Sequence, residues 1–125
     1  MILNLKLSTD SPSLLPDEWL DPLVRLAQVA QTKLEENLHK GHWRGCSTAW
    51  LLGRVHEELA EFQQALRAGD IEEIWREAGD VTCFLSMICD NQTRQKELLD
   101  AFVAQVSAGE SVEPGDALLV GQQLS

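Results

Sequence analysis

The sequence has little positive charge. Its 125 residues include 10 Lys and Arg against 20 Asp and Glu, which gives a formal net charge of −10 at pH 7. A protein this acidic does not attract nucleic acid backbones or anionic membranes through bulk electrostatics. We therefore expect neither nucleic acid nor a membrane among its partners.

Cysteines and long apolar runs are also scarce. There are three cysteines, an odd number without Cys-x-x-Cys spacing, which argues against a disulfide framework or a zinc site and favours reduced thiols. No stretch has the length and apolar character of a bilayer-spanning helix. The first residues lack the uninterrupted apolar segment of a secretory signal. The expected location is the cytoplasm.

The length is typical of a single domain with its own core. Residues 1–15, in which leucines alternate with polar residues before a break, are expected to form an N-terminal arm. Residues 109–125, which contain three glycines and one proline, are expected to form a C-terminal tail. The segment between them has helical periodicity throughout and predicts an all-α antiparallel helical bundle.

Two helices joined by a very short turn form the centre of the predicted fold. The first of them runs from an N-cap at Ser47 or Thr48 to Ala68, and Gly69 is placed to end it in a left-handed conformation. Asp70 then serves as the N-cap of the next helix. So short a connector forces the two helices to be antiparallel neighbours.

A further helix is expected on each side of this hairpin. The N-terminal one begins with Asp21 as N-cap and Pro22 as first helical residue, although a turn before Asp21 can join it, and it continues to His39. The apolar stripe of the third helix stops near Asp90-Asn91. A separate fourth helix, with Leu and Val at helical spacing, is predicted to follow.

Four carboxylates are positioned to converge on the hairpin. Glu58 and Glu61 stand one turn apart on its first helix, and Glu77 and Asp80 stand one turn apart on its second. Glu58 lies eleven residues before Gly69 and Glu77 lies eight residues after it, so the two pairs have similar heights. A solvated acidic face is the simpler interpretation of such a pattern.

Glu77 argues against that simpler interpretation. It falls about 40° from the centre of the apolar stripe around Val81, so we expect it to be largely buried. A carboxylate taken out of water must be neutralised, paired with a base or bound to a cation. No Lys or Arg lies within the stripe. The pattern therefore favours a metal ion.

The loop from Lys40 to Gly45 contains an aromatic ring, a histidine, two cations and two glycines. This composition suits stacking against a base and contact with phosphate oxygens. It suits equally well a connector whose Trp fills the core and whose cations offset a helix C-terminus. Two cations of the last helix could reach a polyphosphate or could be ordinary surface charges. The candidate substrate-contact residues are His42, Trp43, Arg44, Arg94 and Lys96.

The acidic pattern resembles a known family. Glu57-Glu58-x-x-Glu61, a gap of fifteen residues and Glu77-x-x-Asp80 resemble the motif of the MazG-like all-α nucleoside triphosphate pyrophosphohydrolases. That superfamily also includes dimeric dUTPases and phosphoribosyl-ATP pyrophosphatase. The resemblance covers roughly residues 43–90, more than a third of the chain.

The resemblance implies an enzyme that uses Mg²⁺, with Mn²⁺ as a possible substitute. Its reaction would convert a nucleoside triphosphate, with a deoxynucleotide favoured, to the monophosphate and pyrophosphate in a house-cleaning role. The implied metal ligands are Glu58, Glu61, Glu77 and Asp80, and the implied catalytic residues are Glu57 and Glu58. Which carboxylate is the general base stays open. The resemblance also implies a homodimer or homotetramer, and the apolar surface expected on the helices favours the same assembly over a monomeric bundle.

Other functions remain compatible with the same residues. Within the enzyme class, the chain could hydrolyse phosphoribosyl-ATP. A non-catalytic helical module could use the acidic face to bind a basic partner. A di-iron protein fits less well, because such bundles need two Glu-x-x-His pairs and the chain offers only Glu36-x-x-His39.

Overall fold

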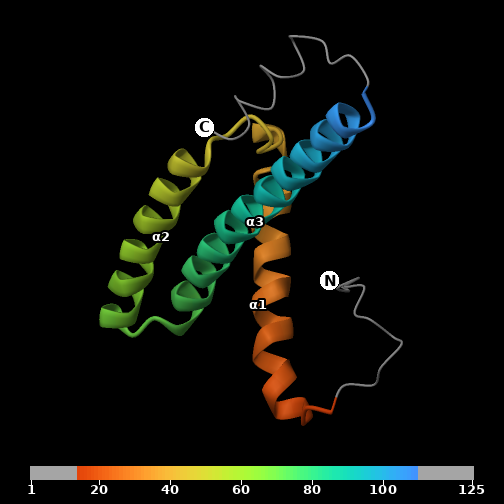
Figure 1. The fold of residues 1–125 in the computed structure, drawn as a ribbon. Coiled ribbons are helices and arrows are strands. Elements are labelled where there is room, and N and C mark those ends of the chain that lie inside the picture. The colour runs from red at the N-terminus through yellow and green to blue at the C-terminus, as the bar shows by residue number, and fades with distance from the viewer. Residues whose placement is uncertain (1–13, 110–125) are drawn as a thin grey trace. The chain divides into compact units, whose positions relative to one another are not determined.

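The computed structural model describes residues 14–109 and shows a helical protein (Figure 1). Its elements are α1 (Asp17–Glu36), the short 3₁₀ helix η1 (Leu38–Lys40), α2 (Thr48–Ala68) and α3 (Ile71–Ser107). No strand occurs in this range, so the predicted all-α fold class is confirmed. Within the same range, no helix is both long and apolar enough to cross a membrane. The predicted arm and tail, residues 1–15 and 109–125, lie almost wholly outside the described residues.

Two compact units make up the described chain. One contains α1, η1 and the segment His56–Cys83. The other contains His42–Val55 and α3 from Phe84 onward. Helices α2 and α3 therefore each contribute to both units. The four predicted metal ligands belong to the first unit, and the loop that carries Trp43 belongs to the second.

Helix α1 begins one turn earlier than the sequence predicts. It starts at Asp17, directly after Pro16, and the amide of Trp19 donates to the carbonyl of Pro16 at 3.0 Å. Asp21 is therefore not the N-cap, and the alternative in which the turn from Pro16 through Leu20 joins the helix is the one that the structure shows. Pro22 lies inside the helix, where its fixed φ is already helical and only one backbone hydrogen bond near the N-terminus is lost. The helix also ends sooner than predicted, before η1.

The connection between α2 and α3 forms as predicted. Ser47 caps α2, since its Oγ accepts a backbone amide of the first turn at 3.1 Å. Gly69 ends α2 with a φ of 69°, and its amide donates to the carbonyl of Ala65 at 3.0 Å. Asp70 Oδ1 accepts the amide of Glu73 at 3.3 Å and so caps α3. The two helices leave this turn as an antiparallel hairpin (Figure 1).

Helix α3 continues through the position where a break was expected. Ile71–Ser107 is one helix of 37 residues, so the prediction of separate third and fourth helices was wrong. Asp90 and Asn91 interrupt the apolar stripe, but no Pro or Gly there interrupts the backbone. Asn91 is buried, and its Nδ2 donates to the carbonyls of Trp43 at 3.1 Å and Cys46 at 3.3 Å. The polar residues therefore anchor a loop instead of ending a helix.

The buried face of α2 is displaced from the predicted one. The apolar spacing of the sequence predicts a core stripe of Leu52, Val55, Leu59, Phe62 and Leu66. Three of these leucines are between 41% and 51% exposed, namely Leu52, Leu59 and Leu66. The buried positions of the helix are Leu51, Val55, Glu58 and Ala65. Val55 belongs to both sets and is buried as predicted, whereas Leu51, Glu58 and Ala65 each stand one residue before an expected leucine, about 100° of helical turn away. Glu58, expected at the border of the core stripe, therefore lies within the buried face.

Helices α1 and α3 approach each other closely at Gly79. A Cβ atom at this position would lie 2.6 Å from Cγ1 of Val29, which is too close for any real contact. Nearby, Sγ of Cys83 donates to the carbonyl of Ala30 at 3.3 Å, and burial raises the pKa of this thiol to about 11. Gly79 thus serves close helix packing.

We expect Gly79→Ala to destabilise the protein although Ala is the better helix former. Overpacking against a stiff valine costs about 1–3 kcal/mol. Gly53→Ala is the matched control, because a Cβ at Gly53 would meet nothing within 4 Å. It should stabilise α2 by up to about 1 kcal/mol. Urea unfolding of both variants measures the difference, and equal stability of the two would contradict the close approach.

Candidate functional site

Three acidic side chains converge between α2 and α3. Glu58 comes from α2, whereas Glu77 and Asp80 lie one turn apart on α3. Each offers one carboxylate oxygen, and these oxygens all lie within 4.8 Å of one another. Glu58 is only 6% exposed, and the other two are partly buried. The expected convergence is therefore seen for these three residues, whereas binding of an ion stays a prediction.

Glu77 has a strongly perturbed carboxyl group. Burial raises its pKa from 4.5 to about 8, with further contributions from hydrogen bonds to Glu73 and Glu61 and from the charges of Glu61 and Asp80. Its Oε2 is buried and has no hydrogen-bond partner among the described residues. The whole side chain is only partly buried, less than the sequence predicts, because it lines a pocket. At neutral pH a proton therefore neutralises Glu77 when no cation does.

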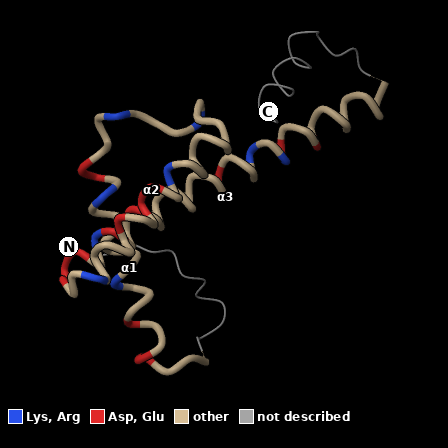
Figure 2. Tube along the Cα trace, turned by 90° about the vertical axis from the view of Figure 1, so that its left-hand side faces the viewer, with Lys and Arg blue, Asp and Glu red and all other residues tan. Residues whose placement is uncertain are grey.

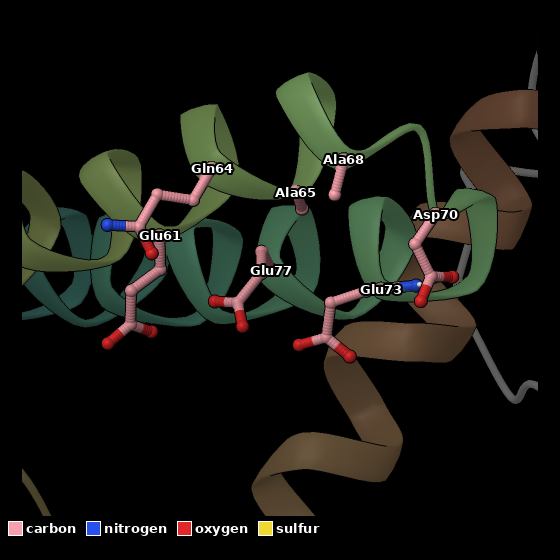
Figure 3. Close-up of a pocket in the computed structure, with 7 residues that line it drawn as sticks. All are labelled: Glu61, Gln64, Ala65, Ala68, Asp70, Glu73 and Glu77. Carbon is pink, nitrogen blue, oxygen red and sulfur yellow. Dashed lines mark hydrogen bonds between the residues drawn. The ribbon is translucent and has the colours of Figure 1, made fainter.

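A pocket of about 510 Å³ lies beside these carboxylates at the turn end of the hairpin. Its lining residues are Glu61, Gln64, Ala65, Ala68, Asp70, Glu73 and Glu77. Figure 3 shows the carboxylates of Glu61, Glu77 and Glu73 on the same side of the hairpin. Glu61, the fourth predicted ligand, is not among the three oxygens that meet within 4.8 Å, but it hydrogen-bonds to Glu77. Figure 2 shows in red how acidic positions recur where α2 runs beside α3.

Lys33 is a residue of this site that the sequence analysis missed. Its Nζ lies 3.4 Å from Oδ2 of Asp80, and the two side chains are 14% and 21% exposed. Within the apolar stripe of α3 that contains Glu77, the sequence has no Lys or Arg. Lys33 instead reaches the carboxylates from α1, 47 residues before Asp80. Its position one turn after Val29, on the inward face of α1, is the signal that could have identified it.

The donor set suits a hard divalent cation. Carboxylate oxygens are the ligands that Mg²⁺ and Mn²⁺ prefer, and the cluster offers no thiolate or imidazole. The buried Oε2 of Glu77 is an acceptor that a cation would satisfy. Carboxylates that repel one another in a partly dry site need a compensating charge, which a single divalent ion supplies. The residues present therefore fit Mg²⁺.

In the second unit, Trp43 is held against α3. Its Nε1 donates to Oδ2 of Asp90 at 2.8 Å, and the ring of His42 stacks on it with centroids 4.0 Å apart. His42 Nδ1 accepts the amide of Arg44 at 3.0 Å. Trp43 is partly buried, while His42 and Arg44 are exposed. The predicted contact loop is thus an ordered turn with a fixed indole.

The two predicted cations of α3 are both paired. Arg94 Nη2 lies 2.9 Å from Oδ2 of Asp90, so Arg94 and Trp43 share that carboxylate. Lys96 Nζ lies 2.8 Å from Oδ1 of Asp100, on an exposed part of the helix. A phosphate group would have to compete with these carboxylates for either cation. Glu57, a predicted catalytic residue, is exposed on α2.

Comparisons with known proteins leave the family open. No protein-family model, curated protein or solved structure matches the chain. The resemblance to MazG-like pyrophosphohydrolases therefore rests on the spacing of the acidic residues.

We expect the stability of the metal-free protein to fall as pH rises. The folded pKa of Glu77, about 8, exceeds its ordinary value of 4.5, so folding favours the protonated form. The protonated Glu77 contributes its full stabilisation below pH 4.5, the ordinary pKa. This contribution is lost as pH rises through the folded-state pKa of about 8. Melting temperatures in EDTA should therefore fall between about pH 5 and about pH 9, and less steeply for Glu77→Gln.

Glu72→Gln is the control for this measurement, because Glu72 is exposed on the first turn of α3. Its melting temperature should follow the wild-type curve. Parallel curves for Glu77→Gln and the wild type would contradict the assignment of the titration to Glu77.

Proposed function

We propose that this protein hydrolyses a nucleoside triphosphate to the monophosphate and pyrophosphate with the help of a divalent cation. The observation that carries the proposal is the meeting of Glu58, Glu77 and Asp80 within 4.8 Å on one hairpin. These three positions are also part of the acidic spacing that resembles the MazG-like motif. A deoxynucleoside triphosphate is the favoured substrate.

The cation would be held by the carboxylates of Glu58, Glu77 and Asp80, with Glu61 beside them. When bound, Mg²⁺ offsets negative charge on phosphate oxygens and lowers the cost of the charge that develops in the transition state. The net charge of −10 supports this assignment, because an acidic protein needs a cation between itself and a polyphosphate.

The chain itself has to position water and accept its proton. Glu57 is exposed next to Glu58, which is suitable for a general base that reaches solvent. Glu77 is less suitable as the base, because burial raises its pKa to about 8 and favours the protonated form. Glu61, at hydrogen-bond distance from Glu77, can orient the Glu77 carboxyl group.

The test is a panel of ribo- and deoxyribonucleoside triphosphates with Mg²⁺, in which pyrophosphate and orthophosphate are measured separately. We expect pyrophosphate release from at least one deoxynucleotide. Glu61→Gln and Glu77→Gln should each reduce turnover at least about 100-fold, the effect of losing one charge-stabilising group. Each substitution removes the negative charge that the carboxylate would carry toward a bound cation and keeps the side-chain volume.

Glu72→Gln again provides the matched control, and it should keep wild-type turnover. Near-normal turnover in both site variants would remove these carboxylates from the reaction. Absence of hydrolysis, together with no thermal stabilisation by Mg²⁺ and a non-hydrolysable nucleotide, would favour the non-catalytic acidic module.

Trp43 stays a predicted substrate contact, and two substitutions separate this role from its structural one. Trp43→Phe keeps a ring but loses the bond to Asp90, so stability should fall by about 1.5–3 kcal/mol with little change in KM. Trp43→Ala should lose stability and also raise KM by the equivalent of about 1–3 kcal/mol, the value of a stacking contact. An unchanged KM in Trp43→Ala would restrict Trp43 to holding the loop.

We also propose that the chain forms a homodimer or homotetramer. Many large apolar side chains are exposed in one copy, including Trp19 at 65%, Leu23 at 63% and Leu66 at 51%. Monomeric proteins rarely leave so much apolar surface uncovered. Sedimentation equilibrium at low micromolar concentration should give twice or four times the 13.9 kDa chain mass. A single active species of monomer mass would contradict the assembly.

A further inference from the structure

Lys33 occupies an unusual place for a lysine. Its side chain is 14% exposed, and its ammonium lies 3.4 Å from Oδ2 of Asp80. Asp80 also offers an oxygen to the carboxylate group formed with Glu58 and Glu77. A cation bound by this group would therefore compete with Lys33 for the carboxylate of Asp80.

The backbone, and not only the flexible side chain, brings Lys33 to this place. Gly79 precedes Asp80, and its missing Cβ lets α3 approach α1 at Val29. Val29 and Lys33 are four residues apart and share one face of α1. The contact that places α1 against α3 therefore also directs Lys33 at the carboxylates.

We propose that Lys33 is an exchangeable counter-ion of the carboxylate site, which pairs with Asp80 in the metal-free protein and moves to the polyphosphate of the substrate when a divalent cation takes Asp80. This inference rests on the proposed function and assigns a role to a residue outside the acidic motif. Lys33 acts as a positioning residue toward Asp80 and as a binding residue toward phosphate.

Electrostatics gives the exchange its direction. A divalent cation at Asp80 competes with the ammonium for the same carboxylate and also repels it. An ammonium left without a partner in a partly buried site is unfavourable, so a bound anion becomes its natural ligand. The four-carbon stem of lysine allows this movement without a change in α1.

If Lys33 exchanges partners in this way, Lys33→Met should strengthen Mn²⁺ binding and weaken pyrophosphate binding. In Lys33→Met, Mn²⁺ no longer competes with the ammonium, so it should bind about 3- to 10-fold more tightly. Inorganic pyrophosphate, added to the Mn²⁺-saturated protein, should bind about 10-fold more weakly because a charged hydrogen-bond donor is missing. A lysine that only supports the fold would weaken both.

Both affinities can be measured by isothermal titration calorimetry on the full-length protein. Lys33→Arg keeps the charge and should return both affinities toward wild type. Arg67→Met is the matched control for the loss of one positive charge, since Arg67 is exposed in the same unit. It should leave Mn²⁺ affinity unchanged. If Lys33→Met does not fold, Lys33→Gln is measured in its place with the same expectations.

The outcomes separate the two proposals. Unchanged or weaker Mn²⁺ binding in the Lys33 variant, or unchanged pyrophosphate binding, would overturn the exchange while leaving the carboxylate site intact. Absence of Mn²⁺ binding in the wild type would overturn both the exchange and the metal site. Tighter Mn²⁺ binding together with weaker pyrophosphate binding supports the exchange.

Discussion

The mutual repulsion of carboxylates on the α2–α3 hairpin is the constraint on which the rest of this structure depends. Glu58, Glu77 and Asp80 bring oxygens within 4.8 Å of one another in a partly dry site. Carboxylates that are partly removed from water and this close to one another cannot all stay ionised without compensation. The protein compensates in two ways: a proton on Glu77, whose pKa is about 8, and the ammonium of Lys33 beside Asp80. A divalent cation could replace both.

The packing of α1 on α3 supplies one of these compensating charges. Gly79 permits the approach, and Ala30 and Cys83 fill the space next to it. The same glycine would weaken an isolated helix, since glycine is a poor helix former. In this protein the glycine weakens α3 locally, but it lets α1 come close enough to place Lys33 beside the acidic cluster. Packing and electrostatics are therefore set by the same contact.

Some predictions from the sequence failed for identifiable physical reasons. The break expected at Asp90-Asn91 does not exist, because Asn91 satisfies the carbonyls of a distant loop while its own backbone stays helical. The start of α1 was placed at Asp21 because Pro22 is common at the first helical position. In the structure Pro22 instead lies in the second turn of α1, where the helix continues although one backbone hydrogen bond is lost. In both places a polar residue or a proline was taken as the end of a helix. In the structure the helix continues through each of them.

The sequence by itself determined the α2–α3 hairpin and the meeting of its carboxylates. Gly69 and Asp70 dictate the turn through local backbone chemistry, and helical spacing then fixes which glutamates face each other. Only the tertiary structure decided that Lys33 joins them and that Glu58 is buried in place of Leu59. The physical reason is that periodicity describes one helix at a time. Which neighbour covers a face, and which charge that neighbour brings, depends on contacts between residues far apart in the chain.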